Sequence, residues 1–210
     1  MRFLRPRPAH LKSRAAYALW AKNYPPHAHN PFMALEEATM RDLLPDLTGK
    51  RVLDLACGTG RWGKIAQVMG AAQVISLDDS PAMLRSGMPP CAAAATMTAL
   101  PLLNASIDAI LCGLAVGHSP DLRAILAEMS RVLVPGGVAL ISDVHPFRAW
   151  GGAQRTFQAG SRTYAIEHYI HSYADYHAAC RNAGLQIDAI REAAPNDQEP
   201  PAVLVLRLVV

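Results

Sequence analysis

The chain is poor in the residues that build disulfide frameworks, metal centres and membrane spans. It has only four cysteines in 210 residues, and none of them forms a C-x-x-C pair. This spacing disfavours a disulfide-stapled fold or a zinc site and is typical of reduced thiols. No apolar run approaches the roughly 20 residues that cross a bilayer, and the N-terminus lacks the apolar block of a secretory signal. We therefore expect a cytoplasmic protein with no metal site and no membrane span.

Strong charge of one sign is also missing, because the formal net charge is only +3. The cations are unevenly placed, since Glu36 is the first acidic residue of the chain. A basic arm of this kind can contact RNA or an anionic membrane surface, but its prolines and its lack of interleaved aromatic and basic residues favour a solvated tail. We expect no nucleic-acid partner. The cations ahead of Glu36 are Arg2, Arg5, Arg7, Lys12, Arg14 and Lys22.

Helical and strand-like segments alternate along the chain, which predicts an α/β fold with a mostly parallel sheet covered on both faces. The hydrophobic content of 51% is ample for one buried core. Residues 1–210 are therefore expected to form a single domain, with residues 1–30 as an N-terminal arm and lid. Residues 144–171 form the one long irregular stretch, and we expect this loop to bind the substrate. Seven strands are predicted, at 51–56, 73–77, 92–97, 107–112, 138–142, 185–190 and 203–210.

The run Asp-Leu-Ala-Cys-Gly-Thr-Gly at 54–60 predicts a ligand site at the end of the first of these strands. Glycine lets the backbone turn sharply into a helix and lets a ligand approach the main chain. Asp78, one strand further on, can accept both hydroxyls of a ribose. The glycines also satisfy G-x-G-x-x-G, so a nicotinamide-dependent oxidoreductase is an alternative. Asp54 argues against it, because a fixed anion there repels a diphosphate and attracts an ammonium group.

Three motifs in order resemble one known family. They are D-L-A-C-G-T-G, S-L-D-D-S-P-A-M-L at 76–84 and R-V-L-V-P-G-G at 131–137. Together they resemble the class I S-adenosylmethionine-dependent methyltransferases, in the branch that includes ubiquinone- and menaquinone-biosynthesis enzymes, continuously from about residue 17 to 143. The resemblance implies a Rossmann-like, seven-stranded sheet, S-adenosylmethionine as cofactor with S-adenosylhomocysteine as product, and methyl transfer to an O, N or C atom of a small-molecule acceptor.

The resemblance also implies a set of cofactor-binding residues around the ends of the central strands. Thr96 departs from the family, which commonly has an aspartate there, and a hydroxyl gains nothing from charge in the hydrogen bond to adenine. Tyr17 and Trp20 are expected to close over the cofactor, or alternatively to pack on the sheet edge. Cys112 is expected to be a small buried side chain near the reacting sulfur rather than a nucleophile. The cofactor set is Tyr17, Trp20, Asp54, Ala56, Cys57, Gly58, Gly60, Asp78, Asp79, Met83, Thr96, Met97 and Cys112.

Methyl transfer needs a general base only where the acceptor must lose a proton. His145 is the first candidate because it follows the fifth strand, and His118 is the second; a structural hydrogen-bonding role is the alternative for both. The long loop supplies residues that suit an aromatic or anionic acceptor, although arginines on loops are often only solvated. The acceptor set is Arg148, Trp150, Arg155, Tyr164 and His168.

Two further interpretations concern activity. The chain has no asparagine/aspartate-proline-proline-aromatic motif after the fourth strand, which argues against amino-directed DNA and glutamine methyltransferases. A non-catalytic protein that binds S-adenosylmethionine without turnover is the remaining alternative.

Overall fold

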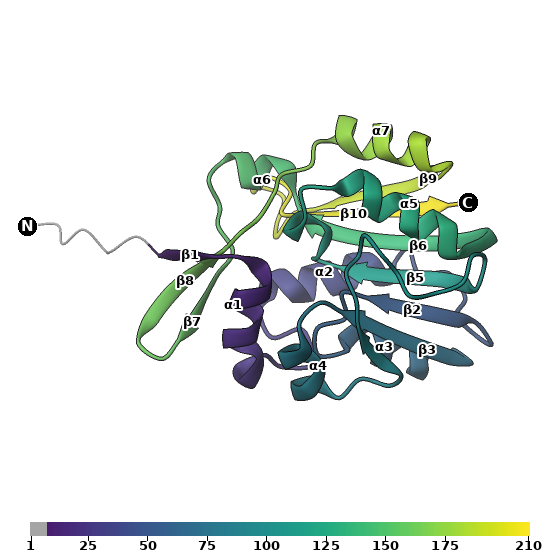
Figure 1. Ribbon diagram of the computed structural model, residues 1–210. Helices are drawn as coiled ribbons and strands as arrows, with labels where there is room; N and C mark the ends of the chain where they lie inside the picture. The colour runs from purple at the N-terminus through teal and green to yellow at the C-terminus, as the bar shows by residue number, and fades with distance from the viewer. Residues whose placement is uncertain (1–7) are drawn as a thin grey trace, which may run out of the picture.

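The computed structural model describes residues 8–210, so Arg2, Arg5 and Arg7 of the basic arm lie outside the described residues. Its main sheet has seven strands in the order β4-β3-β2-β5-β6-β10-β9 (Figure 1). Only β10 runs antiparallel to its neighbours among these described strands. The predicted seven-stranded, mostly parallel sheet is therefore confirmed. The strands are β2 (Arg51–Leu55), β3 (Gln73–Asp78), β4 (Ala92–Ala94), β5 (Ile107–Gly113), β6 (Leu133–Val144), β9 (Gln186–Ala193) and β10 (Val203–Val209).

Helices cover both faces of this sheet because the central strands are apolar on both sides. On β2, Val52 packs into one core cluster and Leu53 into the other. One face is covered by α5 (Leu122–Val132) and α7 (Tyr173–Ala183), and the other by α2 (Pro31–Arg41) and α3 (Arg61–Val68). A further helix, α4 (Pro81–Gly87), follows β3. The residues at its two ends set the boundaries of α7. Ser172 and Asp175 form a capping box at its start, and Gly184 ends the helix in the left-handed conformation.

Three strands differ from the prediction by more than one residue. The strand expected at 185–190 is Gln186–Ala193. The expected strand at 92–97 is only Ala92–Ala94, because an alanine run has little β propensity at a sheet edge. The strand expected at 138–142 begins earlier, because β6 starts at Leu133 and passes through the glycines that precede residue 138. Its pairing with β5 shifts register between Ile107 and Ala109, which accommodates Gly136 at φ +76°.

The stretch 144–171 is not the irregular loop that the sequence predicts. It contains α6 (Pro146–Trp150), β7 (Thr156–Ala159) and β8 (Arg162–Ile166). The N-terminal strand β1 (Ala9–Leu11) pairs in parallel with β8, so three short strands form a second sheet beside the main body (Figure 1).

A small core of its own holds this second sheet against α1 (Ser13–Trp20). Ala16, Phe157 and Ile166 are buried there, with Tyr17 and Trp20 packed around them. A single-turn 3-10 helix, η1 (Ala21–Asn23), continues α1, and another, η2 (Val116–His118), follows β5. The lid expected from residues 1–30 and the loop expected from 144–171 therefore form one unit in the part that the structure describes. Of the helices in residues 8–210, none has both the length and the hydropathy that a bilayer-spanning segment requires.

Candidate active site

A cavity of about 290 Å³ opens beyond the carboxyl ends of β2, β3 and β5. This is the position where open parallel sheets bind ligands, because the loops after the central strands diverge there. The cavity brings together twelve of the residues that the sequence predicts for the site. They are Tyr17, Asp54, Ala56, Cys57, Gly58, Asp78, Asp79, Met83, Thr96, Met97, His118 and Arg155.

The floor of the cavity is the turn between β2 and α3. Gly58 and Gly60 both have positive φ, at +56° and +83°. A Cβ at Gly60 would lie 2.6 Å from the Cβ of Pro89, so a larger residue there would displace the neighbouring backbone. Gly60 belongs to the turn but does not line the cavity itself. Glycine is therefore required by backbone conformation at both positions and by a close approach at the second.

Asp78 sits at the end of β3 with its carboxylate turned to this glycine turn. Its Oδ2 accepts from the Gly58 amide at 2.7 Å, and its Oδ1 accepts from the Ser80 amide at 2.8 Å. Burial raises the pKa of Asp78 to about 6, so the side chain is mostly ionised at neutral pH. Each oxygen still has acceptor capacity for a ligand hydroxyl, because an ionised carboxylate offers about four lone-pair positions.

Asp54 lies deeper, at the end of β2, and is almost fully buried. Its Oδ2 accepts from the Gly63 amide at 2.7 Å, which caps the first turn of α3. Burial raises the pKa of Asp54 to about 7. The sequence argument treats Asp54 as a fixed anion, whereas burial favours its protonated form and so weakens the charge on which that argument depends.

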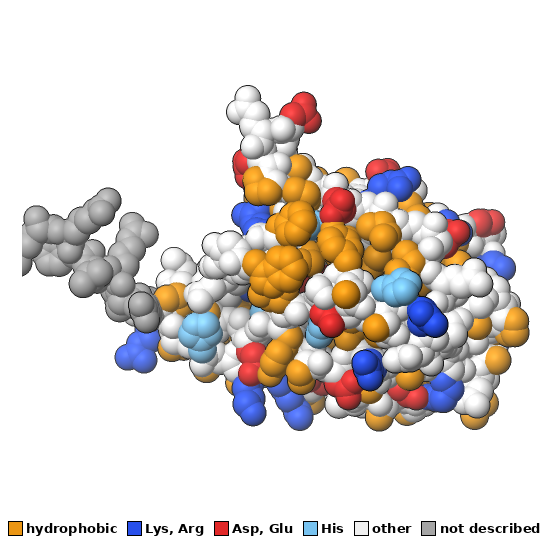
Figure 2. Space-filling model, turned by 90° about the horizontal axis from the view of Figure 1, so that it is seen from above, with side chains coloured by type: hydrophobic (Ala, Val, Ile, Leu, Met, Phe, Trp, Pro, Cys, Tyr) orange, Lys and Arg blue, Asp and Glu red, His pale blue; other side chains and the backbone are white. Residues whose placement is uncertain are grey.

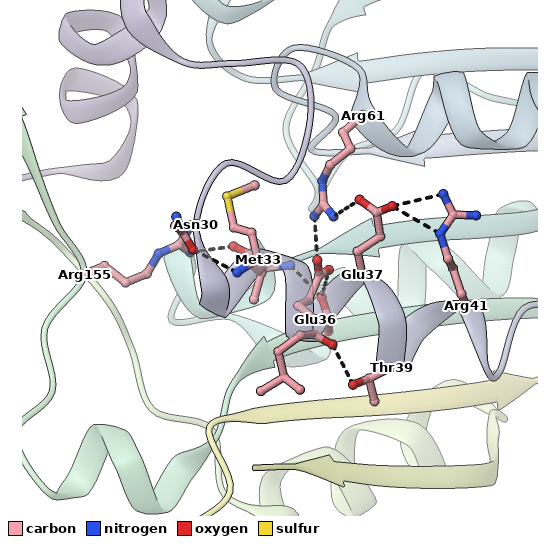
Figure 3. Close-up of polar contacts among 11 residues, drawn as sticks. Asn30, Met33, Glu36, Glu37, Thr39, Arg41, Arg61 and Arg155 are labelled. Carbon is pink, nitrogen blue, oxygen red and sulfur yellow. Dashed lines mark hydrogen bonds and ion pairs between the residues drawn. The ribbon is translucent and has the colours of Figure 1, made fainter. Parts of the chain in front are cut away.

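The wall opposite Asp78 contains a buried ion pair that the sequence analysis missed. Glu36 from α2 is fully buried and binds the Arg61 guanidinium at 2.6 Å, while Glu37 lies 3.2 Å from the same group (Figure 3). Ser142 Oγ donates to the other Glu36 oxygen at 2.6 Å. Arg61 lines the cavity, but its charge is neutralised by these carboxylates. The sign in the sequence is the pair of adjacent glutamates in a largely apolar segment. One sequence does not show which cation they bind.

Trp62 supplies a second feature that the sequence analysis missed. Its indole Nε1 is buried and has no hydrogen-bond partner within residues 8–210, although Trp62 lines the cavity. A buried N–H donor without a partner is costly unless a ligand accepts from it. A Cβ at Gly113 would lie 2.4 Å from this atom, so glycine at the end of β5 keeps room for the indole.

The aromatic lid residues divide between this cavity and a neighbouring one. Tyr17 and Tyr24 line the first cavity, whereas Trp20 lines the second and stacks on Phe157 of β7 with ring centroids 4.9 Å apart. Burial raises the pKa of the Tyr17 hydroxyl, which therefore stays protonated as a donor. Trp20 packs on the small sheet rather than on the edge of the main one.

His118 lies where the two cavities meet. Its Nδ1 is 2.9 Å from the carbonyl oxygen of Glu167, which can only accept, so Nδ1 carries the proton. Its Nε2 then accepts, with the Tyr17 hydroxyl at 3.0 Å and Arg155 Nη1 at 2.9 Å. Burial, together with the charge of Arg155, lowers the pKa of His118 to about 3. The imidazole is therefore neutral at physiological pH, with its lone pair turned toward the cavity residues.

His145 is placed elsewhere. It is fully buried and is not part of either cavity lining. Its Nε2 lies 2.8 Å from both the Tyr173 hydroxyl and Glu192 Oε1, and its Nδ1 accepts from the Phe147 amide at the start of α6. This placement corresponds to the structural alternative for His145 and gives no support to its role as a base. Cys112 is likewise fully buried in the core, where burial raises the pKa of its thiol.

A second cavity of about 480 Å³ adjoins the first, and Tyr24, Leu114 and Arg155 line both. Of the predicted acceptor residues, Arg148, Arg155 and His168 line it. Trp150 and Tyr164 do not. Tyr164 packs in the small core, and Trp150 is 58% exposed on α6. Figure 2 shows that hydrophobic side chains gather on one face of the molecule.

The residues of the first cavity fit the cofactor that the resemblance implies. Asp78 has acceptor capacity for the ribose hydroxyls, the glycine turn leaves the main chain open to a ligand, and Trp62 holds a buried donor that has no partner among residues 8–210. Asp79, Met83, Thr96 and Met97, which belong to the cofactor set that the resemblance implies, all line the cavity. Thr96 Oγ1 is 3.4 Å from Thr98 Oγ1 and is not committed to a charged partner.

Comparisons with known proteins agree with this geometry. A family described as "Methyltransferase domain" matches residues 53–141. The chain is 31% identical over 172 residues to a 2-phytyl-1,4-naphtoquinone methyltransferase of Synechococcus elongatus, covering 75% of this chain and 70% of that protein.

A second relative covers less. The chain is 36% identical over 113 residues to a demethylmenaquinone methyltransferase of Lactococcus lactis, and the match spans 48% of this chain and 45% of that protein. A crystal structure of an S-adenosylmethionine-dependent methyltransferase from Mesorhizobium loti superposes with a TM-score of 0.73 at 21% identity, over 86% of this chain and 100% of that one. This last likeness shows a shared fold.

Proposed function

This chain belongs to the class I S-adenosylmethionine-dependent methyltransferases, and on that premise we propose that it methylates an O, N or C atom of a small-molecule metabolite. The observation that carries the proposal is Asp78, a buried carboxylate held by two backbone amides against a glycine turn. The second cavity provides space for an acceptor next to the first. A nicotinamide-dependent oxidoreductase is not favoured, because the family match and the named relatives are methyltransferases.

The chain's own residues bind and orient the reactants. When bound, S-adenosylmethionine supplies the methyl group together with its own leaving group. Asp78 holds the ribose hydroxyls, and the Trp62 N–H and the ionised form of Asp54 serve the amino-acid moiety, one as a donor and the other as an anion. Placing a nucleophile about 3 Å from a methyl group and in line with its leaving group can lower the barrier by about 7–11 kcal/mol. Most of the catalytic task is therefore positioning.

We propose His118, rather than His145, as the residue that accepts a proton where the acceptor must lose one. It lines the first cavity as a neutral imidazole that the Glu167 carbonyl holds in one tautomer, and it accepts a proton once its Nε2 is released from Tyr17 and Arg155. Tyr17 and Tyr24 cover the cavity from the lid and exclude water from it. The cytoplasm remains the proposed location, in keeping with four unpaired cysteines of which three are buried.

Calorimetric titration with S-adenosylhomocysteine tests the proposal. Asp78→Asn removes the charge while keeping the shape, and charged hydrogen bonds contribute about 1.5–3 kcal/mol each. We expect the affinity to fall by at least about tenfold. Asp197→Asn, a matched change at an exposed acid far from the cavity, should leave the affinity unchanged. Tight NADH binding by the wild type without S-adenosylhomocysteine binding would contradict the proposal, whereas binding with no turnover on any acceptor would indicate a non-catalytic protein.

A further inference from the structure

Arg155 is a partly buried cation that Asp143 and Glu36 stabilise only from a distance. Within residues 8–210, no aspartate or glutamate lies at ion-pair distance from its guanidinium, whereas Arg61 has two such partners. Its Nη1 donates to the Leu114 carbonyl at 2.6 Å and faces His118 Nε2 at 2.9 Å. Within residues 8–210, Nη2 and Nε of Arg155 make no hydrogen bond. A cation that is only partly exposed is costly unless it is paired, so the site favours an anion.

The second cavity provides the surroundings for that anion. Its lining contains the cations Arg148 and Arg155 and no aspartate or glutamate among residues 8–210. His168 also lines the second cavity, and its Nε2 lies 3.1 Å from Asp143 Oδ1. The Asp143 carboxylate is therefore already bound to His168. Figure 3 shows Arg155 reaching toward the start of α2, where Asn30 caps the helix. The partial positive charge of that helix end adds to the field of the two arginines.

Most of the rest of this lining is apolar or aromatic, and its other polar residues are Asn30, Gln154 and Thr156. Trp20, Tyr24, Phe32, Met33 and Ile166 form much of the wall. Such a wall suits a flat or hydrophobic body and makes a doubly charged phosphate costly to desolvate. A carboxylate has one negative charge and two oxygens that match the planar guanidinium fork.

Resting on the proposed function, we infer that the methyl acceptor is a carboxylic acid with an aromatic or apolar body, whose carboxylate pairs with Arg155 at the junction of the two cavities. Arg155 is then the residue that selects acids over neutral analogues. Because Arg155 lines both cavities, the carboxylate lies next to the reacting space and orients the acceptor toward it.

The pairing has a consequence for His118. The charge of Arg155 is, after burial, the second cause that lowers the pKa of this imidazole. A carboxylate on Arg155 offsets that charge, so the same ligand that occupies the site makes His118 a better proton acceptor.

The test uses the full chain saturated with S-adenosylhomocysteine and three probes, cinnamate, cinnamamide and phenyl phosphate. We expect calorimetry to show cinnamate binding at least about tenfold more tightly than the isosteric amide, since the amide lacks the charge. Arg155→Gln should abolish the preference, Arg155→Lys should restore part of it, and Arg162→Gln, an exposed arginine at the far end of the same hairpin, should leave it intact.

The outcomes separate this inference from the proposed function. If the wild type does not bind S-adenosylhomocysteine, the methyltransferase proposal itself is contradicted. If S-adenosylhomocysteine binds but cinnamate does not, or if acid and amide bind equally, the inference is overturned. It is overturned as well if the preference survives in Arg155→Gln or if phenyl phosphate binds more tightly than cinnamate. The S-adenosylhomocysteine affinity of each variant reports whether its first cavity is intact.

Discussion

The buried carboxylate of Asp54 predicts a stability that falls as the pH rises. Its pKa is raised from 3.8 to about 7 by burial, so the folded protein holds a proton that the unfolded chain releases. The corresponding stabilisation is complete below about pH 4 and is lost as the pH rises through about 7. A shift of about 3 pKa units corresponds to about 4 kcal/mol over that range.

Asp54→Asn isolates this contribution. The amide oxygen of asparagine can still accept from the Gly63 amide, but the side chain has no charge to desolvate. Between pH 5 and pH 8, the unfolding free energy of the ligand-free wild type should fall by about 3 kcal/mol relative to the variant. For a chain of this size, about 2–4 °C in Tm corresponds to 1 kcal/mol, so the Tm advantage of the variant should grow by about 6–12 °C.

Circular-dichroism melts of both proteins at the two pH values measure the difference. Asp197→Asn, at an exposed position, is the control and should show no such pH dependence. The reasoning fails if the Tm difference between Asp54→Asn and the wild type is the same at pH 5 and pH 8. The variant should also bind S-adenosylhomocysteine more weakly, because the amino group of the ligand loses its anion; greater stability would then accompany weaker binding.

Two histidine substitutions test the assignment of the base. His118→Ala should lower turnover by about 10²–10⁴-fold if the acceptor must lose a proton, because general-base catalysis contributes about that much, and steady-state kinetics on an accepted substrate measures it. Unchanged turnover would remove His118 from the mechanism. His145→Ala should lower the unfolding free energy by about 1–3 kcal/mol, since it leaves the partners of a fully buried hydrogen-bonded group unsatisfied, while turnover per folded molecule stays the same. A loss of turnover in the folded variant would restore His145 as the base.

The sequence predicts the main sheet well because local signals there agree with one another. Apolar strands, the glycine turn and the Ser172 capping box each specify an element from a few neighbouring residues. The same holds for the residues that follow β2 and β3, since the carboxyl ends of parallel strands must meet. Asp54 and Asp78 are therefore placed at the cavity by topology alone.

The second sheet escapes sequence analysis because its contacts are not local. Strand β1 has three residues and finds its partner in β8, far along the chain. Burial is equally invisible from one sequence. Asp54 reads as a fixed anion until its enclosure is known, and His145 reads as a base until Tyr173 and Glu192 are seen around its ring. Arg155 reads as one more loop arginine, because the absence of a carboxylate near it, among residues 8–210, is a fact of three-dimensional packing.

The parallel pairing of β1 with β8 also constrains the order in which the molecule can be completed. Ala9 lies opposite Tyr164, so β1 has no partner until the chain has been synthesised as far as β8. Contacts of such wide sequence separation form late, because closing a long loop costs entropy before any contact repays it. The sheet of β1, β7 and β8, which lines part of the second cavity, is therefore expected to assemble last, after the first five strands of the main sheet have been synthesised.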